Sequence, residues 1–196
     1  WLAFSARVVE EKRAALIFNN GFTTETAWDG VACFSTSHTL AGGGTWRNRL
    51  ATDADLSATA LTQVLIDLQN QTKLDSGQLV APITGLTLLI PPDYEFLAER
   101  IIRSTQLAQS ADNDINPLKS RRTWQIVVNP YLTDSDAWFV LASNNKQHGI
   151  CSYTRTGIYA PPRMVDARTG NLIYKIRFRR SWGMTWGQNS FGTTGA

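Results

Sequence analysis

The clearest feature of the hydrophobic pattern is an apolar run, Leu86–Ile90, followed by two prolines and an amphipathic segment. A run of this length without polar alternation is typical of a strand that is buried on both faces. Pro91 and Pro92 cannot extend the hydrogen-bond ladder of a strand, but proline fits the first turn of a helix. We therefore predict a central strand that leads through a turn into a helix. The apolar face of that helix should consist of Leu97, Ala98, Ile101 and Ile102.

A strand that leads into a helix N-terminus is a common place for a bound phosphate, but this one is poorly suited to that use. The two prolines remove two backbone donors, and no glycine lets a ligand approach the backbone. Asp93 and Glu95 already place negative charge at the positive end of the helix dipole. Gly42–Gly44 is not followed by the Gly-Lys-Ser/Thr sequence of a phosphate loop either. We expect a scaffold unit with no ligand at Pro92.

Residues 1–20 have the pattern of an amphipathic helix. Its apolar positions recur every seven residues, at Leu2, Val9 and Leu16, and are flanked by Val8, Ala15 and Ile17. Gly21 follows directly and is suited to a left-handed C-cap. The pattern is already helical at Trp1, and no initiator methionine precedes it, so we expect further residues before this point in the natural protein.

A second helix is predicted over residues 53–69, with Asp55 or Ser57 as its N-cap. The apolar stripe of this helix should be formed by Leu56, Ala60, Leu61, Val64, Leu65 and Leu68.

Farther along the chain, the stretch Gln106–Lys119 is polar, and we predict that it forms an excursion over the surface.

Four further stretches have strand character. Val31–Phe34 is an extended apolar stretch after an Asp-Gly turn. Thr123–Val128 and Ala137–Ala142 are β-rich runs separated by turn residues, and we predict that they form an antiparallel pair. Asn171–Arg180 alternates cleanly, which predicts a half-buried strand with a basic outer face. Its inner face should carry Leu172, Tyr174, Ile176 and Phe178.

Composition narrows the class of protein. Of the 196 residues, 43% are hydrophobic and 18% are charged, which is typical of a folded chain. No apolar run approaches the roughly 20 residues that cross a bilayer, and we expect no association with membranes. The net charge of +3 is unevenly distributed, because residues 1–166 carry about −2 and the last thirty carry +5.

Candidate catalytic groups are few. Cys33 with His38, or Cys151 with His148, could pair as nucleophile and base, so a cysteine-dependent hydrolase is one alternative. Neither pair has an obvious orienting carboxylate, and Cys33 lies in an apolar run that should be buried. We therefore favour reduced, buried thiols, with His38 as a hydrogen-bonding residue at a strand end. The two pairs are too far apart in sequence for a convincing zinc site, so neither a metal nor another cofactor is expected.

The basic strand near the C-terminus suggests a second alternative, a nucleic-acid-binding module. Its cations Lys175, Arg177, Arg179 and Arg180 could contact phosphates. Trp182 or Trp186 could stack on bases. Because no known binding module accompanies them, we favour a solvated strand face or a contact between subunits, with non-specific contact to nucleic acid left open.

The order of these elements resembles that of the major head subunit of Mu-like tailed phages. The resemblance covers nearly the whole chain, and each motif is short, so the shared order is more specific than any one of them. The residues that carry it are Glu11–Asn19 with Phe22, Asp29–Ser35 with His38, Asp55–Ser57, Leu88–Pro92 with Ala98, Ile101 and Ser104, Asn116-Pro117, Val127–Leu132 and Ala137–Phe139.

The resemblance implies an α+β subunit with the Hong Kong 97-type capsid fold. Residues 1–38 would hold the spine helix and a segment of the peripheral domain, 39–143 the axial domain, and 144–196 the return strands of the peripheral domain. The N-terminal arm and extended loop that the family has before the spine helix do not occur in this sequence.

The function that the resemblance implies is structural. Copies of the subunit would form the hexamers and pentamers of an icosahedral virion shell that encloses double-stranded DNA, assembled in the host cytoplasm. Its partners would be other copies, minor or decoration proteins and the portal. No enzymatic activity and no catalytic or cofactor-binding residue is expected.

Overall fold

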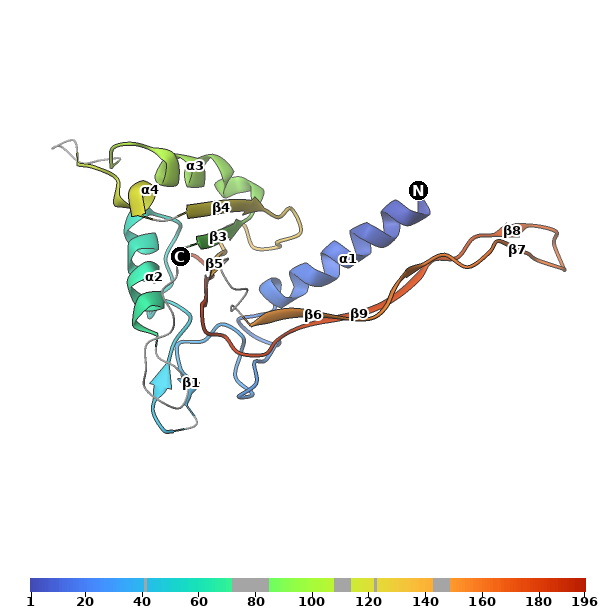
Figure 1. The fold of residues 1–196 in the computed structure, drawn as a ribbon, viewed down its shortest axis with the longest axis horizontal. Helices are drawn as coiled ribbons and strands as arrows, with labels where there is room; N and C mark the ends of the chain where they lie inside the picture. Colours follow the sequence, from blue (N-terminus) through green and yellow to red (C-terminus); the bar gives the residue numbers. More distant parts are fainter. Residues whose placement is uncertain (41, 72–84, 108–113, 122, 143–148) are drawn as a thin grey trace.

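The computed structural model describes residues 1–40, 42–71, 85–107, 114–121, 123–142 and 149–196. It consists of a body built on a four-stranded sheet, a long N-terminal helix, and a two-stranded hairpin that projects beyond the body (Figure 1). Within the body, helices lie over the sheet, and the two ends of the chain are far apart in the view.

The helices are α1 Leu2–Asn19, α2 Ala58–Asn70, α3 Glu95–Arg103 and α4 Pro117–Arg121, with a 3-10 turn η1 at Pro92–Tyr94. The strands are β1 His38–Thr39, β2 Thr45–Trp46, β3 Gly85–Ile90, β4 Thr123–Val128, β5 Trp138–Ala142, β6 Ile150–Tyr159, β7 Met164–Val165, β8 Leu172–Ile173, β9 Arg177–Met184 and β10 Ser190–Thr193.

The four-stranded sheet has the order β10-β5-β3-β4. β3 lies inside the sheet, as the apolar run predicted, parallel to β4 and antiparallel to β5. The prediction that the β4 and β5 segments pair with each other is wrong, because β3 lies between them. After β3, the chain returns through η1, α3 and α4 to the end of the sheet where β3 begins. β4 therefore runs parallel to β3 on one side, and β5 pairs with β3 on its other side.

The central strand is buried on both faces, as predicted. Leu86, Leu88 and Ile90 are at most 1% exposed and pack with α2 and α3, while Leu89 belongs to a second cluster. The α3 residues predicted for the apolar face all contact the first cluster. Ala98 and Ile102 are fully buried there, and Leu97 and Ile101 are partly buried.

The second cluster lies against α1 and the segment that follows it. The ring centroid of Phe139 in β5 lies 5.0 Å from that of Phe18, 5.6 Å from that of Phe22 and 5.1 Å from that of Phe34. A Cβ at Gly192 would lie 2.8 Å from the Phe139 ring, so only glycine lets β10 approach β5 this closely at that position. The aromatic cluster therefore joins the end of α1 to the sheet.

The second predicted helix is confirmed with a shorter N-terminal part. Ser57 is the N-cap, and its hydroxyl accepts a hydrogen bond from the Ala60 amide at 3.1 Å. Residues 53–56 precede the helix instead of belonging to it, although Leu56 still reaches the core. The other predicted stripe residues of α2 all contact the first cluster.

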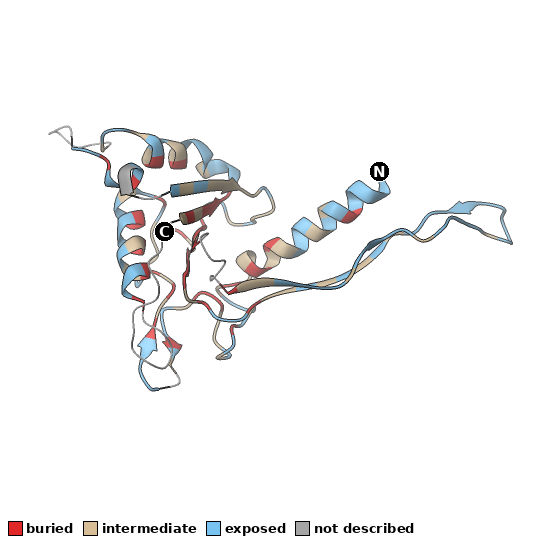
Figure 2. Cartoon of the chain, in the orientation of Figure 1, coloured by how far each residue is buried: buried red, intermediate tan, exposed pale blue. Residues whose placement is uncertain are grey.

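The first helix is confirmed as α1, and the predicted apolar residues Ala15 and Ile17 are buried, but the predicted cap is wrong and the stripe is exposed toward the N-terminus. Leu2 and Val9 are 44% and 47% exposed, whereas Ala6, Ala15 and Ile17 are buried. Only the C-terminal end of α1 lies against the body (Figure 2), and Val9 and Leu16 of the predicted stripe line an open groove beside the hairpin. Gly21 does not have positive φ, and glycine is needed there because a Cβ would lie 2.4 Å from the Ile17 carbonyl oxygen.

Two loop predictions also need correction. Val31–Phe34, predicted as an extended apolar stretch, forms no regular strand, since its ladder contact is an isolated bridge between Thr26 and Ala32. The predicted surface excursion Gln106–Lys119 ends inside the fold. The Asn116 side chain donates to the Ile101 carbonyl at 2.6 Å and positions Leu118, which is 3% exposed in the core.

The projecting hairpin is the segment 150–184. β6 pairs antiparallel with β9 along most of its length, and β7 pairs with β8 near the tip. The strand predicted over Asn171–Arg180 is therefore divided between β8 and β9. Ile176 and Phe178 are half-buried as predicted, but Leu172 and Tyr174 are 53% and 62% exposed because the tip lies beyond the body.

The division into segments 1–38, 39–143 and 144–196 stays a prediction. β10 lies in the third segment and forms one sheet with strands of the second. The polypeptide thus returns to the body after the hairpin.

Candidate functional site

A series of exposed apolar side chains lies on the projecting hairpin. Seven large apolar side chains from its middle to its tip are exposed by 37% to 63% of their area, which is unusual for a two-stranded element. They are Ile158, Tyr159, Met164, Val165, Leu172, Ile173 and Tyr174. An unpartnered ribbon with this composition has the properties of a surface for binding another protein.

The predicted basic face is present on the same hairpin. Lys175, Arg177 and Arg179 are exposed, and the guanidinium of Arg177 lies 5.7 Å from the centre of the Tyr159 ring. Arg180, which was grouped with them, instead forms an ion pair with Glu10 of α1. The two aromatic residues proposed to stack on bases differ in exposure, since Trp182 is half-buried and Trp186 is 50% exposed.

The base of the hairpin is fixed at Gly149. Its φ of +70° and the closeness of the Trp186 carbonyl oxygen, 1.6 Å from where a Cβ would be, require glycine. The Gly149 carbonyl accepts hydrogen bonds from the amide and the hydroxyl of Thr185 at 2.8 Å and 2.9 Å. These contacts set the direction in which the hairpin leaves the body.

A groove of about 830 Å³ runs between α1 and the hairpin. Its floor includes Leu16, Phe178 and Trp182, and the guanidinium groups of Arg13 and Arg155 line it. The groove is open, so it extends the hairpin surface onto the helix.

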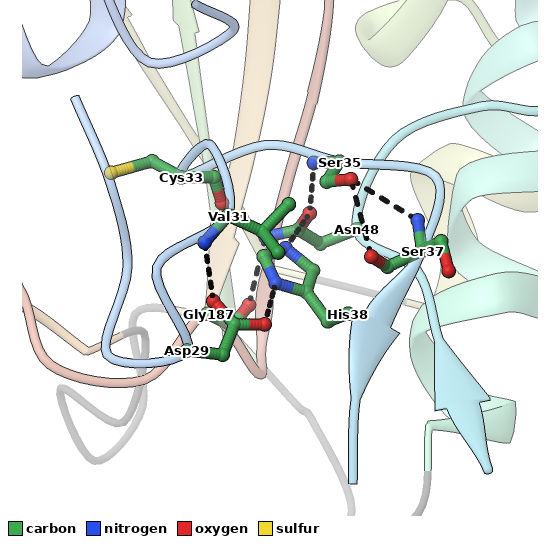
Figure 3. A network of polar contacts seen from close by, with 8 residues as sticks. All are labelled: Asp29, Val31, Cys33, Ser35, Ser37, His38, Asn48 and Gly187. Carbon is green, nitrogen blue, oxygen red and sulfur yellow. Dashed lines mark hydrogen bonds and ion pairs between the residues drawn. The ribbon is translucent and has the colours of Figure 1, made fainter. Parts of the chain in front are cut away.

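A buried polar network joins three segments of the chain beside the body (Figure 3). His38 is fully buried at the start of β1, as a hydrogen-bonding residue at a strand end. Its Nδ1 lies 2.8 Å from Asp29 Oδ2, and its Nε2 lies 3.0 Å from Asn48 Oδ1. The ring also stacks on Trp46 at 4.5 Å.

The Asn48 amide fixes the direction of these hydrogen bonds. Its Nδ2 donates to the carbonyls of Cys33 at 2.8 Å and Gly187 at 3.4 Å, so its Oδ1 is the acceptor that faces Ser35 N and His38 Nε2. The His38 Nε2 is therefore a donor. With Asp29 ionised, its carboxylate accepts the hydrogen bond at His38 Nδ1.

Asp29 is held in its charged form by this arrangement. Burial alone would raise the pKa of its carboxyl group, but hydrogen bonds from His38 and the Val31 amide, with the charge of His38, hold the pKa below its usual value. The network thus has a structural role, since it clamps the Asp29 loop to Asn48 and the C-terminal segment.

The same geometry separates the residues of the predicted Cys33 and His38 pair. Both ring nitrogens of His38 face Asp29 and Asn48, and Cys33 is 1% exposed in the aromatic cluster. Burial raises the pKa of the Cys33 thiol to about 11, and the charges of Glu25 and Asp29 act in the same direction. A thiolate nucleophile is not available at this position. In the other predicted pair, Cys151 with His148, the histidine lies outside the described residues.

Within the described parts of the chain, no group of three or more His, Cys, Asp or Glu side chains could hold a metal ion. None of the helices there has the length and apolarity needed to cross a bilayer.

The sequence pattern identified His38 but missed Asp29 and Asn48 as its partners, and it missed the ion pair between Glu10 and Arg180. Asp29 could have been suspected, because it is an isolated carboxylate nine residues before a buried histidine. Asn48 and Glu10 carry no local signal, because their partners come from distant segments.

Comparison with known proteins gives a consistent result. A sequence model of a family described as phage capsid protein matches residues 2–183. Among solved structures, this fold is similar to a chain in the capsid of an empty GTA particle, with a TM-score of 0.53 and 9% sequence identity. The match covers 98% of this chain and 65% of that chain, so the present residues span about two thirds of that capsid subunit. A search of curated proteins gave no match.

Proposed function

Because this chain belongs to the phage capsid protein family, we propose that its copies assemble into the hexamers and pentamers of an icosahedral tailed-phage head that encloses double-stranded DNA. The observation that carries the proposal is the projecting hairpin, whose base packs against α1 while its large apolar residues from the middle to the tip are exposed. A ribbon of two strands is only marginally stable alone, so contact with a neighbouring subunit explains both its length and its composition.

The finer features of the fold belong to the same proposal. In a Hong Kong 97-type subunit of the Mu-like kind, α1 would be the spine helix, the four-stranded body the axial domain and the hairpin the peripheral domain. Closed rings multiply modest contacts per subunit into a stable shell.

The shell proposal assigns no enzymatic role to this chain and places it in the virion. A portal, minor capsid proteins and decoration proteins would be further partners, and assembly would take place in the host cytoplasm. The buried state of Cys33 and the engagement of both His38 nitrogens support a structural role for these residues.

Electron microscopy of the purified full-length product under assembly conditions tests the proposal. We expect closed shells with fivefold and sixfold units, and nuclease-resistant DNA in shells recovered from infected cells. A product that remains monomeric under all assembly conditions would contradict the shell function.

The exposed cations Lys175, Arg177 and Arg179 favour one second candidate, a direct nucleic-acid-binding role. It predicts tight binding of DNA by isolated subunits, which weakens steeply with salt and in the double variant Arg177→Ala with Arg179→Ala. If isolated natural subunits bind DNA no more tightly than this double variant, the direct nucleic-acid-binding role is excluded.

A further inference from the structure

The charge of the chain is divided between its two ends. Residues 150–196 hold seven of the 19 basic residues and one of the 16 acidic residues, a net charge of +6. Residues 1–149 hold the other twelve and fifteen, a net charge of −3. Copies of such a chain attract each other when the C-terminal part of one meets the rest of another.

The positive charge is displayed on the projecting hairpin. Among the described residues, Arg180 is its one cation in an ion pair. The single carboxylate of the hairpin, Asp166, accepts hydrogen bonds from the Arg168 amide and the Thr169 hydroxyl within the tip turn. The remaining cations are all exposed, namely Arg155, Arg163, Arg168, Lys175, Arg177 and Arg179.

The opposite charge gathers on the body around η1. Asp55, Asp93, Glu95 and Asp136 are exposed there, and none of them forms an ion pair within the described residues. Asp55 and Asp136 flank Gly195, where a Cβ would lie 3.1 Å and 2.6 Å from their nearest atoms.

Tyr94 lies among these carboxylates, and their negative charge affects its hydroxyl group. Burial raises the pKa of its hydroxyl, and the charges of Asp55 and Asp136 raise it further. Next to it, Phe96 exposes 81% of its area, so the acidic surface also presents a large apolar side chain.

We propose that the projecting hairpin of one copy docks on the acidic surface around η1 of the next copy. This inference rests on the proposed self-assembly and names its contact. Charge complementarity favours it, because contact between two hairpins would bring like charges together, whereas hairpin-to-body contact pairs opposite charges. Such a contact joins different surfaces of the two copies, which is the arrangement that closes rings.

The apolar residues beside the cations select a protein partner over DNA. Phosphates would satisfy Arg177 and Arg179 but would leave Leu172, Ile173 and Tyr174 in water, whereas a neighbouring subunit that presents Phe96 buries them. The hairpin also extends away from its own body, as Figure 1 shows, so its tip is presented to another copy.

The test uses two charge-reversal variants of the full chain with complementary defects. The hairpin variant is Arg177→Glu with Arg179→Glu, and the body variant is Asp93→Lys with Glu95→Lys. Arg7→Glu with Lys119→Glu is a matched control for the hairpin variant, since both residues are exposed, both lie outside η1 and α3, and the charge change is the same. Light scattering measures the assembly rate, electron microscopy identifies shells, and circular dichroism confirms folding.

We expect each reversal variant alone to assemble about 10- to 100-fold more slowly than the natural chain, and an equimolar mixture of the two to recover. The control should assemble normally. The docking proposal is overturned if either variant assembles normally, or if a mixture of the two folded variants fails to assemble. Either result leaves the proposed shell function intact. Faster assembly of the hairpin variant with the natural chain would show hairpin-to-hairpin contact instead. Normal shells that merely lose DNA would assign the cations to DNA, and failure of the natural chain to assemble would remove both proposals.

Discussion

Glu10 of α1 forms an ion pair with Arg180 of β9, and this pair joins the long helix to the projecting hairpin. The two side chains are 13% and 30% exposed, so the contact is partly shielded from solvent. Arg180 belongs to the strand that carries the exposed cations Arg177 and Arg179. One arginine of this strand therefore anchors it to the helix, and its neighbours remain available for a partner.

This ion pair should stabilise the packing of helix and hairpin by a measurable coupling energy. A double-mutant cycle with Glu10→Gln and Arg180→Gln should give a coupling of about 0.5–1 kcal/mol in urea unfolding, near the upper end for partly exposed pairs. The more exposed pair of Glu99 and Arg103 within α3 is the matched control and should give about 0.3–0.5 kcal/mol. Equal couplings for the two pairs would contradict the shielding argument.

Two leucines should separate folding from association. Leu88 in β3 is fully buried, and Leu88→Ala should lower the free energy of unfolding by about 2–5 kcal/mol. Leu172 near the hairpin tip is 53% exposed, and Leu172→Ala should change that free energy by less than about 0.5 kcal/mol while slowing assembly. Thermal unfolding and light scattering on the same samples distinguish the effects. A tip variant that unfolds early but assembles normally would place Leu172 in the monomer's core.

The parts of the fold that sequence predicted are those encoded locally. The strand at Leu86–Ile90 and the helix that Ser57 caps depend on residues close together in the chain, and both are confirmed. Pairing of β4 with β5 was predicted from their proximity in sequence, but β3 occupies the place between them. The stripe through Leu2 and Val9 failed because helical periodicity does not reveal how much of a helix meets the body.

The candidate site was predicted only in its composition. Alternation identified the basic face at Arg177 and Arg179 but could not tell a strand inside a sheet from a ribbon that projects into solvent. The buried network was recognised only at His38, because Asp29 and Asn48 reach it from loops whose paths depend on the whole fold. The distribution of charge, in contrast, can be read from the sequence alone. The excess of positive charge after Asp166 lies on the hairpin.

The hydrogen bond between Asp29 and His38 predicts acid sensitivity. The pKa of Asp29 is lower in the folded chain than its ordinary value of 3.8, so the pair stabilises the fold above about that pH and is lost as pH falls through the folded value. Asp29→Asn should reduce the free energy of unfolding at pH 7 by about 1–3 kcal/mol. The difference from the natural chain should shrink when both are measured at pH 3.

Asp93→Asn is the control for this comparison, because it removes one negative charge from an exposed position. Urea unfolding of this variant should follow the natural chain at both pH values to within about 0.5 kcal/mol. A constant deficit of Asp29→Asn from pH 7 to pH 3 would mean that Asp29 acts through packing and not through its charge.

The two thiols should react at very different rates with an alkylating reagent or a disulfide probe. Cys33 is 1% exposed, and burial raises the pKa of its thiol to about 11, so little thiolate forms at pH 8 and the reagent cannot reach it. Cys151 is partly exposed on β6 and should react first. Time courses with Cys33→Ser and Cys151→Ser assign the two phases, and urea should accelerate only the slow one. Rapid reaction of Cys33 in the folded chain would show an accessible, activated thiol and reopen the hydrolase alternative. Slow reaction, with shell assembly unchanged after Cys151 is blocked, would leave both thiols outside the function of the chain.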